Sequence, residues 1–187
     1  MPALVAILLG CGLGTVAGGS IRHLAQLRFR YEWIILLTFV AQGVARGRLT
    51  GVHATSAGTT VWIMSSTLLM LALLAERRRP GVLLAWTGVG LNLVAVLANN
   101  GMPVVLPAGV DPGLASASIV RTLGFYQVAG KSTLGAIWGD VLVVKLGAAL
   151  LVLSPGDVLL ATGVAVIIAG ACLGEEPRPQ GGGLPPI

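Results

Sequence analysis

Long apolar runs with few charges are the feature of this sequence that most restricts its fold. The mean hydropathy is +0.90, and five apolar segments cover residues 3–18, 31–45, 57–75, 81–99 and 157–174. A membrane-spanning helix needs roughly 20 predominantly apolar residues. Because backbone groups in lipid have no water to bond, they must pair within the segment. We therefore predict an all-α fold, a polytopic transmembrane helical bundle.

A sixth apolar segment, residues 134–153, contains Asp140 and Lys145. A charged side chain at the centre of a span costs about 2.5–3.5 kcal/mol on insertion scales. We expect this segment to be interfacial or re-entrant, which gives five spans; the alternative is a sixth span. A single transmembrane domain then covers residues 1–174, and the Pro- and Gly-rich residues 175–187 form a disordered tail.

The distribution of arginines predicts the orientation of the bundle, because short cytoplasmic loops carry an excess of Lys and Arg. Residues 20–30 and 76–80 together hold six arginines, whereas the loop between the second and third segments holds Arg46 and Arg48. We therefore expect a multi-pass cell-membrane protein with its N-terminus outside. Residues 20–30 and 76–80 are then cytoplasmic, and residues 100–156 form a long outer loop.

The net charge of +5 indicates which partners to expect. Basic residues at the cytoplasmic edge attract anionic membrane lipids, whereas nucleic-acid binding is a poor explanation for them. A membrane-protein partner or a homo-oligomer is a further expectation. Five spans place Cys11 and Cys172 at opposite faces of the bilayer, which argues against a disulfide. With no CxxC motif and no pair of histidines, we expect no metal site and no cofactor.

Amide side chains gather near the end of the fourth apolar segment. Asn92 lies about two turns before this end, where an amide bonds to a neighbouring helix or binds a ligand. Asn99, Asn100 and Gly101 follow, and Asn and Gly tolerate the left-handed conformation that ends a helix. The sequence thus makes Asn92, Asn99, Asn100 and Gly101 candidate binding residues at the outer membrane boundary.

Two carboxylates lie on the same predicted side of the membrane. Asp140 interrupts the sixth apolar segment, and Asp157 opens the last one after a Ser-Pro-Gly turn. If the two meet, one pKa rises and the pair shares a proton, so it can activate water and protonate a leaving amine. We expect both to converge with Asn99 and Asn100 on one polar pocket. The structural alternative makes Asp157 a helix N-cap and pairs Asp140 with Lys145.

Three short motifs support a family resemblance. Residues 99–104 are Asn-Asn-Gly-Met-Pro-Val, residues 138–140 are Trp-Gly-Asp, and residues 154–157 are Ser-Pro-Gly-Asp. With the N-terminal apolar helix and the basic stretch 21–30, they resemble a family of small bacterial membrane proteins catalogued as domain of unknown function 5317. The resemblance covers roughly residues 1–172. It implies this architecture and carries no activity.

The order, spacing and membrane side of Asp140 and Asp157 are also similar to those of prolipoprotein signal peptidases, small helical membrane proteases with two catalytic aspartates. This resemblance implies catalytic roles for Asp140 and Asp157 at the outer leaflet. The sequence departs from that family at residues 154–156, where Ser-Pro-Gly replaces Asn-x-Ala. Residues 81–99 also lack the Gly-Asn-x-x-Asp-Arg element of those enzymes.

These features favour a non-enzymatic membrane protein, namely a scaffold, an accessory subunit or a small-ligand binder with a polar pocket on its outer face. The alternative is an aspartate-dyad hydrolase of the membrane peptidase type, acting at the outer leaflet. A transporter or channel is disfavoured because the five main segments hold no ionisable residue at mid-span, where ion pathways usually place them.

Overall fold

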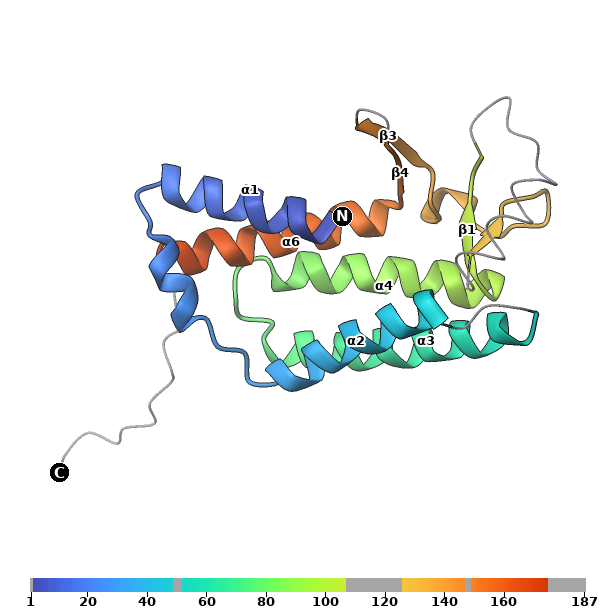
Figure 1. Cartoon of the computed structure of the whole chain (residues 1–187), viewed down its shortest axis with the longest axis horizontal. Coiled ribbons are helices and arrows are strands. Elements are labelled where there is room, and N and C mark those ends of the chain that lie inside the picture. The colour runs from blue at the N-terminus through green and yellow to red at the C-terminus, as the bar shows by residue number, and fades with distance from the viewer. Residues whose placement is uncertain (1, 49–51, 107–125, 147–148, 175–187) are drawn as a thin grey trace.

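The structure is a computed structural model that describes residues 2–48, 52–106, 126–146 and 149–174. Most of these residues lie in helices that run along one long axis (Figure 1). The helices are α1 (Pro2–Val16), η1 (Ile21–Gln26), α2 (Glu32–Arg48), α3 (Val52–Ala75), α4 (Val82–Asn99), η2 (Ala136–Trp138) and α6 (Pro155–Cys172), where η marks a 3₁₀ helix. The predicted tail, residues 175–187, and residues 107–125 of the predicted outer loop lie outside the described residues.

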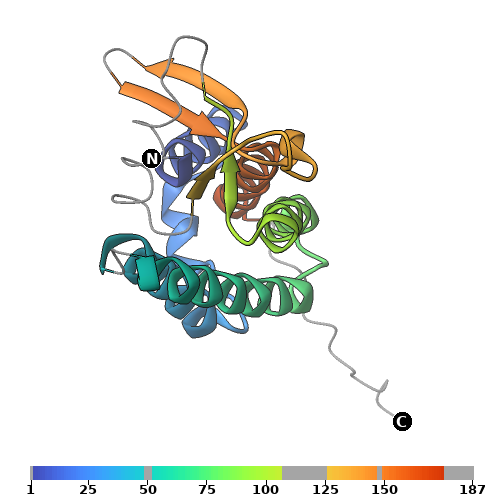
Figure 2. The ribbon, with the colours of Figure 1, turned by 90° about the vertical axis from the view of Figure 1, so that its right-hand side faces the viewer.

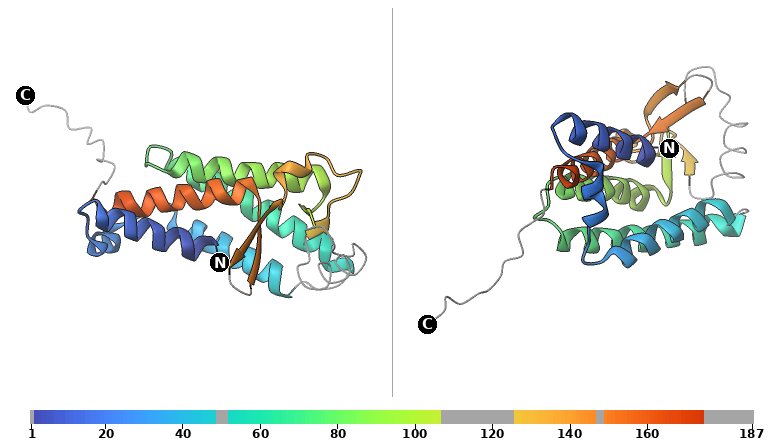
Figure 3. Two further views of the ribbon diagram at one scale, coloured as in Figure 1. Left: turned by 90° about the horizontal axis from the view of Figure 1, so that it is seen from above. Right: turned by 60° about the vertical axis from the view of Figure 1, so that its left-hand side comes forward.

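Helix α6 is the central element of the bundle. It packs against α1 on one side and α4 on the other, and α3 joins α4 to the outlying helix α2. Seen along the helices, α1, α6 and α4 form one group, with α3 and α2 as a layer beneath it (Figure 2). The view from above shows α1 and α6 side by side and running in the same direction (Figure 3).

Glycines bring α6 close to α4. A Cβ added to Gly88 would collide with the backbone of Gly156 and Leu160, and one added to Gly163 would lie 2.6 Å from the carbonyl oxygen of Gly81. Both helices therefore need a bare Cα where they meet. Close backbone approach of this kind is how membrane helices associate, because lipid provides no hydrophobic driving force between them.

Glycines also allow α1 to approach α6 closely. A Cβ at Gly10 would lie 2.6 Å from the carbonyl oxygen of Ala165, and one at Gly14 would lie 2.6 Å from the Cβ of Cys172. As the residue number rises by four on α1, the contacted residues on α6 also rise by four, from Ala165 and Ile168 to Ala169 and Cys172. This order of contacts makes the two helices parallel.

The basic loops meet at one end of the bundle, which we call the arginine end. The backbone N–H of Arg30 donates to Glu76 Oε1 at 2.6 Å, and Arg79 donates to Glu76 Oε2 at 2.8 Å and to the carbonyl oxygen of Arg28. Helix α6 also ends there, since His23 Nδ1 lies 2.9 Å from the carbonyl oxygen of Cys172. Within the basic stretch 20–30, residues Ile21–Gln26 form the 3₁₀ helix η1, which has no buried residue.

Four short strands at the opposite end, the loop end, correct the all-α prediction. They are β1 (Met102–Val104), β2 (Tyr126–Val128), β3 (Leu142–Leu146) and β4 (Ala149–Leu153). Strands β1 and β2 pair in parallel, and β3 and β4 form an antiparallel hairpin. Pro103 cannot continue helix α4, so the backbone beyond α4 is extended and satisfies its polar groups by pairing between strands.

Residues 134–153 contribute no sixth helix. They form η2 and the β3–β4 hairpin, so α6 begins at the end of the bundle where α4 stops. Strand β3 contains consecutive valines, Val143 and Val144, and β-branched side chains favour a strand over a helix. The segment is therefore not a sixth helical span, in line with the favoured prediction.

Three helical segments among the described residues are long and apolar enough to span a membrane, namely Ala57–Ala75, Val82–Asn99 and Pro155–Cys172. The apolar parts of α1 and α2, Leu4–Val16 and Glu32–Gly43, are shorter. At 1.5 Å per residue, the 15 residues of α1 reach about 22 Å, against a hydrocarbon core of about 30 Å. The length of the helices thus supports three spans and does not establish five.

Apolar side chains cover the outside of the bundle as well as its interior. Large hydrophobic residues such as Leu8, Leu13, Leu71 and Leu97 are each more than half exposed. Less than half of each of the three long apolar segments is buried inside the structure. A soluble monomer rarely exposes contiguous apolar patches of this extent. These helices are therefore those of a membrane protein, with lipid covering the outward faces.

The two cysteines lie together, which corrects their predicted placement at opposite faces. The side chains of Cys11 and Cys172 interact with each other, and both cysteines are free. The prediction was wrong because α1 and α6 run in the same direction, so the second half of α1 lies beside the last turns of α6. The positions of the two cysteines in the sequence did not indicate that they lie at the same level of the bundle.

Candidate functional site

Two groups of polar side chains lie at the loop end, where α4 ends and α6 begins. The first group joins the two helices through Asn92, Ser154 and Asp157, and we call it the amide bridge. The second surrounds Asn99 and Asn100 and forms the wall of a pocket, which we call the loop-end pocket. Helix α4 contributes to both.

The amide bridge is a closed set of hydrogen bonds. Asn92 Nδ2 donates to Asp157 Oδ1 at 2.8 Å, and Ser154 Oγ donates to Asn92 Oδ1 at 2.7 Å. The backbone N–H of Asp157 donates to Ser154 Oγ at 2.9 Å, and that of Ser154 donates to Asp157 Oδ2 at 3.3 Å. Ser154 is fully buried and Asn92 is 6% exposed. Every polar atom of the two side chains on α6 thus has a protein partner.

The sequence explains why the amide bridge forms at this point. Ser154 and Asp157 are the N-cap and N3 residues of a capping box, and Pro155 occupies the first turn of α6. A carboxylate in the first turn also interacts favourably with the helix dipole. The sequence predicted Asp157 as the N-cap, whereas the N-cap is Ser154 and Asp157 is the N3 residue that completes the capping box. Gly156 leaves room for Asn92, because a Cβ at Gly156 would collide with its side-chain oxygen.

Asn99 holds the loop beyond β2 against the end of α4. Its Nδ2 donates to the carbonyl oxygen of Leu134, and its Oδ1 accepts from the N–H of Leu134, both at 2.9 Å. Gln127 Nε2 donates to the carbonyl oxygen of Asn99 at 2.6 Å. The side-chain amide of Asn99 therefore bonds both the N–H and the carbonyl oxygen of Leu134, as the backbone of a neighbouring strand would. These bonds fix one wall of the loop-end pocket.

Asn100 and Gly101 end helix α4. Asn100 has a left-handed backbone with φ of 54°, and the N–H of Gly101 donates to the carbonyl oxygen of Val96 at 3.1 Å, as the sequence predicts for a C-cap. Gly101 is buried, whereas Asn100 is exposed. Within the described part of the chain, the side-chain amide of Asn100 makes no hydrogen bond, so it is available to a ligand.

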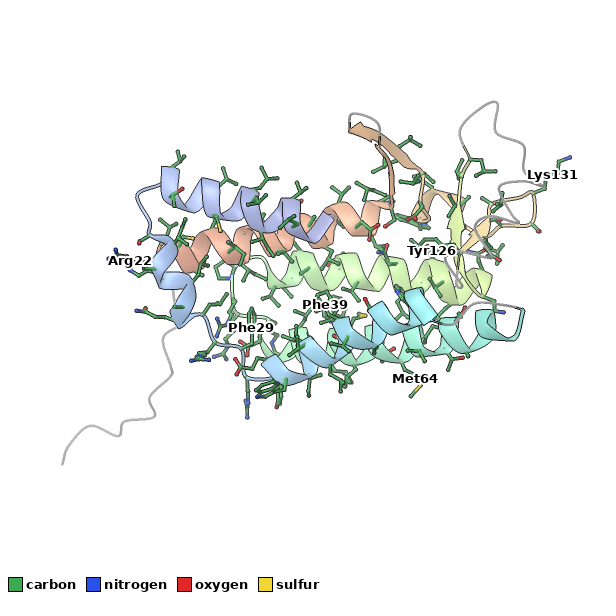
Figure 4. The ribbon with its side chains drawn as sticks, viewed as in Figure 1. Arg22, Phe29, Phe39, Met64, Tyr126 and Lys131 are labelled. Carbon is green, nitrogen blue, oxygen red and sulfur yellow. The ribbon has the colours of Figure 1, made fainter. Side chains whose placement is uncertain are left out.

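The loop-end pocket has a volume of about 450 Å³. It lies between the last turn of α4 and the segment that follows β2. Its lining residues are Leu97, Ala98, Asn99, Asn100, Gln127, Val128, Gly130, Ser132, Thr133 and Leu134. None of them is ionisable. Lys131 belongs to the same segment but is directed away from the body of the protein (Figure 4).

Asp140 lies at the edge of β1. Its N–H donates to the carbonyl oxygen of Pro103 at 2.8 Å, and its carbonyl oxygen accepts from the N–H of Val105 at 2.9 Å. The residue is 6% exposed. The next residue, Val141, donates to the carbonyl oxygen of Leu153, directly before the cap of α6. Asp140 is thus brought to the end of the bundle where Asp157 lies.

The profile of a Family of unknown function (DUF5317) matches residues 26–169. The chain belongs to this family. The DUF5317 match begins within η1 and ends three residues before the end of α6, so it includes the amide bridge and the loop-end pocket. No curated protein and no solved structure matches the chain.

The structure of this DUF5317 member distributes the predicted site residues over three neighbouring places. Asn92 and Asp157 meet in the amide bridge, Asn99 and Asn100 line the pocket, and Asp140 joins the β1 edge. The predicted partner of Asp140, the side chain of Lys145, lies outside the described side chains. Among the described residues, no group of three or more His, Cys, Asp or Glu side chains could hold a metal ion.

Sequence reasoning did not select three lining residues, Gln127, Ser132 and Thr133. It assigned residues 100–156 to one long outer loop, within which only the apolar segment 134–153 was distinguished, so residues 126–133 received no role. A signal was present, because Ser132 and Thr133 are adjacent hydroxyl residues after Gly130, and clusters of this composition indicate a loop that can carry function.

Proposed function

We propose that this DUF5317 protein is a five-span cell-membrane protein that binds a small polar ligand in the loop-end pocket, on the outer face of the membrane. The single observation that carries the proposal is a pocket of about 450 Å³ with polar, non-ionisable walls, in which the amide of Asn100 is unbonded among the described residues. Pockets of roughly 300–1,000 Å³ with a few convergent polar groups are typical small-molecule sites. This is the ligand-binding form of the non-enzymatic roles that the sequence favours.

The orientation in this proposal rests on the arginine end. The two basic stretches that meet there hold six arginines, whereas the opposite end holds Arg46 and Arg48, in the last turn of α2. Such an excess marks the cytoplasmic side, so the loop end and the N-terminus face outward. Helices α1 and α2 lie beside the three long helices, and in this proposal they span as well. Their shorter apolar lengths are accommodated by local thinning of the bilayer and by arginines that extend to its surface.

The proposal is tested by thermal unfolding of the full-length protein in nanodiscs with a library of small polar compounds that includes neutral, anionic and cationic members. Ser132→Trp fills the pocket, and Lys131→Trp places the same ring on the adjacent residue outside it. We expect at least one compound to raise the Tm of the wild type and of Lys131→Trp, but not of Ser132→Trp. A ligand at 100 times its Kd adds about 2.7 kcal/mol of stability. No shift with any compound, or an equal shift in Ser132→Trp, would overturn the proposal.

A second candidate is the aspartate-dyad hydrolase, and one observation favours it. The hydrogen bond from Val141 to Leu153 brings Asp140 beside the strand that leads into α6, whose first turn carries Asp157. Asp140→Asn and Asp157→Asn separate chemistry from structure, because Asn keeps the size of the side chain and an oxygen that can accept a hydrogen bond, while Ser154 remains the N-cap. If both variants are stable and neither complements a strain that lacks the gene, a hydrolase is supported. Complementation by both would refute the dyad.

A further inference from the structure

We infer that the ligand of the loop-end pocket is a neutral, hydroxyl-rich compound of the size of one or two sugar rings. This inference rests on the proposed function and adds the chemical class of the ligand. The observations behind it are the lack of charge in the pocket wall, the kind of hydrogen-bonding groups left free there, and the apolar side chains between them.

Neutrality follows from the lining residues. An ionised ligand taken from water into a pocket needs an opposite charge or several strong hydrogen bonds to offset its desolvation. Among the described residues, the pocket wall provides amides, hydroxyls and aliphatic groups, and no ionisable side chain. The nearest cation in the described sequence, Lys131, is exposed and directed away from the body of the protein (Figure 4). A charged compound would therefore enter the pocket without compensation.

The free polar groups match hydroxyl groups of a ligand. In the part of the chain that the structure describes, the Asn100 amide and the Ser132 hydroxyl make no hydrogen bond. Thr133 Oγ1 accepts from the N–H of Gly130 at 2.8 Å, which leaves its proton to donate. Gln127 uses Nε2 for Asn99, which leaves its carbonyl oxygen to accept. Donors and acceptors are thus mixed around the pocket, and a hydroxyl group, which both donates and accepts, satisfies either kind.

The apolar residues of the pocket restrict the class further. Leu97, Val128 and Leu134 lie among the polar lining residues and offer aliphatic surface to the ligand. A sugar ring combines C–H surface with equatorial hydroxyls, so it can use both kinds of wall at once. A purely apolar compound would instead leave the amide of Asn100 and the hydroxyl of Ser132 buried without partners, which is costly.

The pocket is held in shape by its own hydrogen bonds. Two hydrogen bonds join Asn99 to Leu134, and a third joins Gln127 to Asn99. Together they connect α4, β2 and the segment that follows β2. A preformed wall reduces the entropy that binding must overcome. A volume of about 450 Å³ is at the lower part of the range for small-molecule pockets, which suits one or two rings.

The test uses saturation-transfer NMR on the full-length protein in nanodiscs. The probes are neutral hexoses and N-acetylhexosamines, each compared with its uronic acid and its amino sugar, in which the ring is kept and one substituent is replaced by a charged group. Asn100→Gly removes the amide but keeps a residue that tolerates the left-handed backbone. Ser132→Ala removes the hydroxyl. Lys131→Gln is the matched control, since it removes a charge from a residue that does not line the pocket.

We expect a neutral probe to receive saturation from the wild type and from Lys131→Gln. Asn100→Gly and Ser132→Ala should each weaken binding about threefold to tenfold, the effect of one lost hydrogen bond. Binding of an acid or an amino sugar more tightly than its neutral counterpart would overturn the inference and leave the proposed function standing. If no sugar probe receives saturation but a compound of another class raises the Tm in the thermal library, the inference is likewise overturned and the proposed function stands. Absence of binding in both the NMR and the thermal experiments would overturn the proposed function itself.

Discussion

The amide bridge should be the most sensitive point in the bundle, and Asn92→Ala is the change that tests it. The substitution removes the donor to Asp157 Oδ1 and the acceptor for Ser154 Oγ in one step. Ser154 is fully buried, so its hydroxyl would lose its only described acceptor. The cap of α6 itself remains, because the two bonds between Ser154 and Asp157 do not involve Asn92.

The magnitude can be bounded from the two bonds that are lost. A hydrogen bond to a charged group contributes about 1.5–3 kcal/mol, and a buried hydroxyl without a partner costs about 1–3 kcal/mol. Interhelical bonds measured inside a membrane protein average only about 0.6 kcal/mol, since the unfolded helices find other partners in the membrane. Asn92 bonds a carboxylate near a helix end, which places it above that average. We therefore expect Asn92→Ala to lower the free energy of unfolding by about 2 kcal/mol.

Asn92→Asp serves as the matched variant, because it keeps the shape and places a second carboxylate beside Asp157. Two ionised carboxylates at this distance repel each other, and neither can donate the hydrogen bond that the amide of Asn92 donates to Asp157. Unfolding in mixed micelles should show Asn92→Asp to be at least as unstable as Asn92→Ala at pH 7. An Asn92→Ala variant within about 0.5 kcal/mol of the wild type would refute this account of the bridge.

Three further outcomes are expected. Gly156→Ala should destabilise strongly, because a Cβ there collides with α4, whereas Gly12→Ala meets nothing within 4 Å and should not destabilise in the same unfolding assay. A cysteine replacing Arg78 should resist impermeant maleimide added outside intact cells, and its labelling would reverse the proposed orientation. Dibromobimane fluoresces when it links two neighbouring thiols. It should become fluorescent with the wild type and not with Cys11→Ser. Fluorescence in Cys11→Ser would place Cys172 beside another thiol.

The sequence predicts the helices well and the strands poorly, for a physical reason. An apolar run bounded by charges or by a proline indicates a membrane-spanning helix. The ends of the predicted segments 81–99 and 157–174 lie within two residues of the ends of α4 and α6. Residues 134–153 are equally apolar, but apolar content does not separate a helix from a buried hairpin. The consecutive valines Val143 and Val144 favour a strand, and this signal is missed when only the apolar content and length of the segment are considered.

The candidate site was predictable only in part, because its contacts join distant parts of the chain. The cap at Asp157 was expected from four consecutive residues, whereas the bond from Asn92 to Asp157 spans 65 positions. The sequence identified Asn92 as a buried amide that needs a partner without identifying that partner. Gln127 reaches the pocket because β2 pairs with β1 in parallel, and three-residue strands leave almost no pattern in a sequence.

The spacing of the amides on α4 connects the two parts of the site. Asn92 and Asn99 are seven residues apart, so they lie on the same face of the helix, two turns from each other. One fixes the start of α6, and the other fixes the loop that forms the pocket wall. Because α4 is held to α6 by glycine contacts along the same side, it cannot tilt without breaking the amide bridge. The geometry of the pocket therefore depends on the packing of the membrane helices.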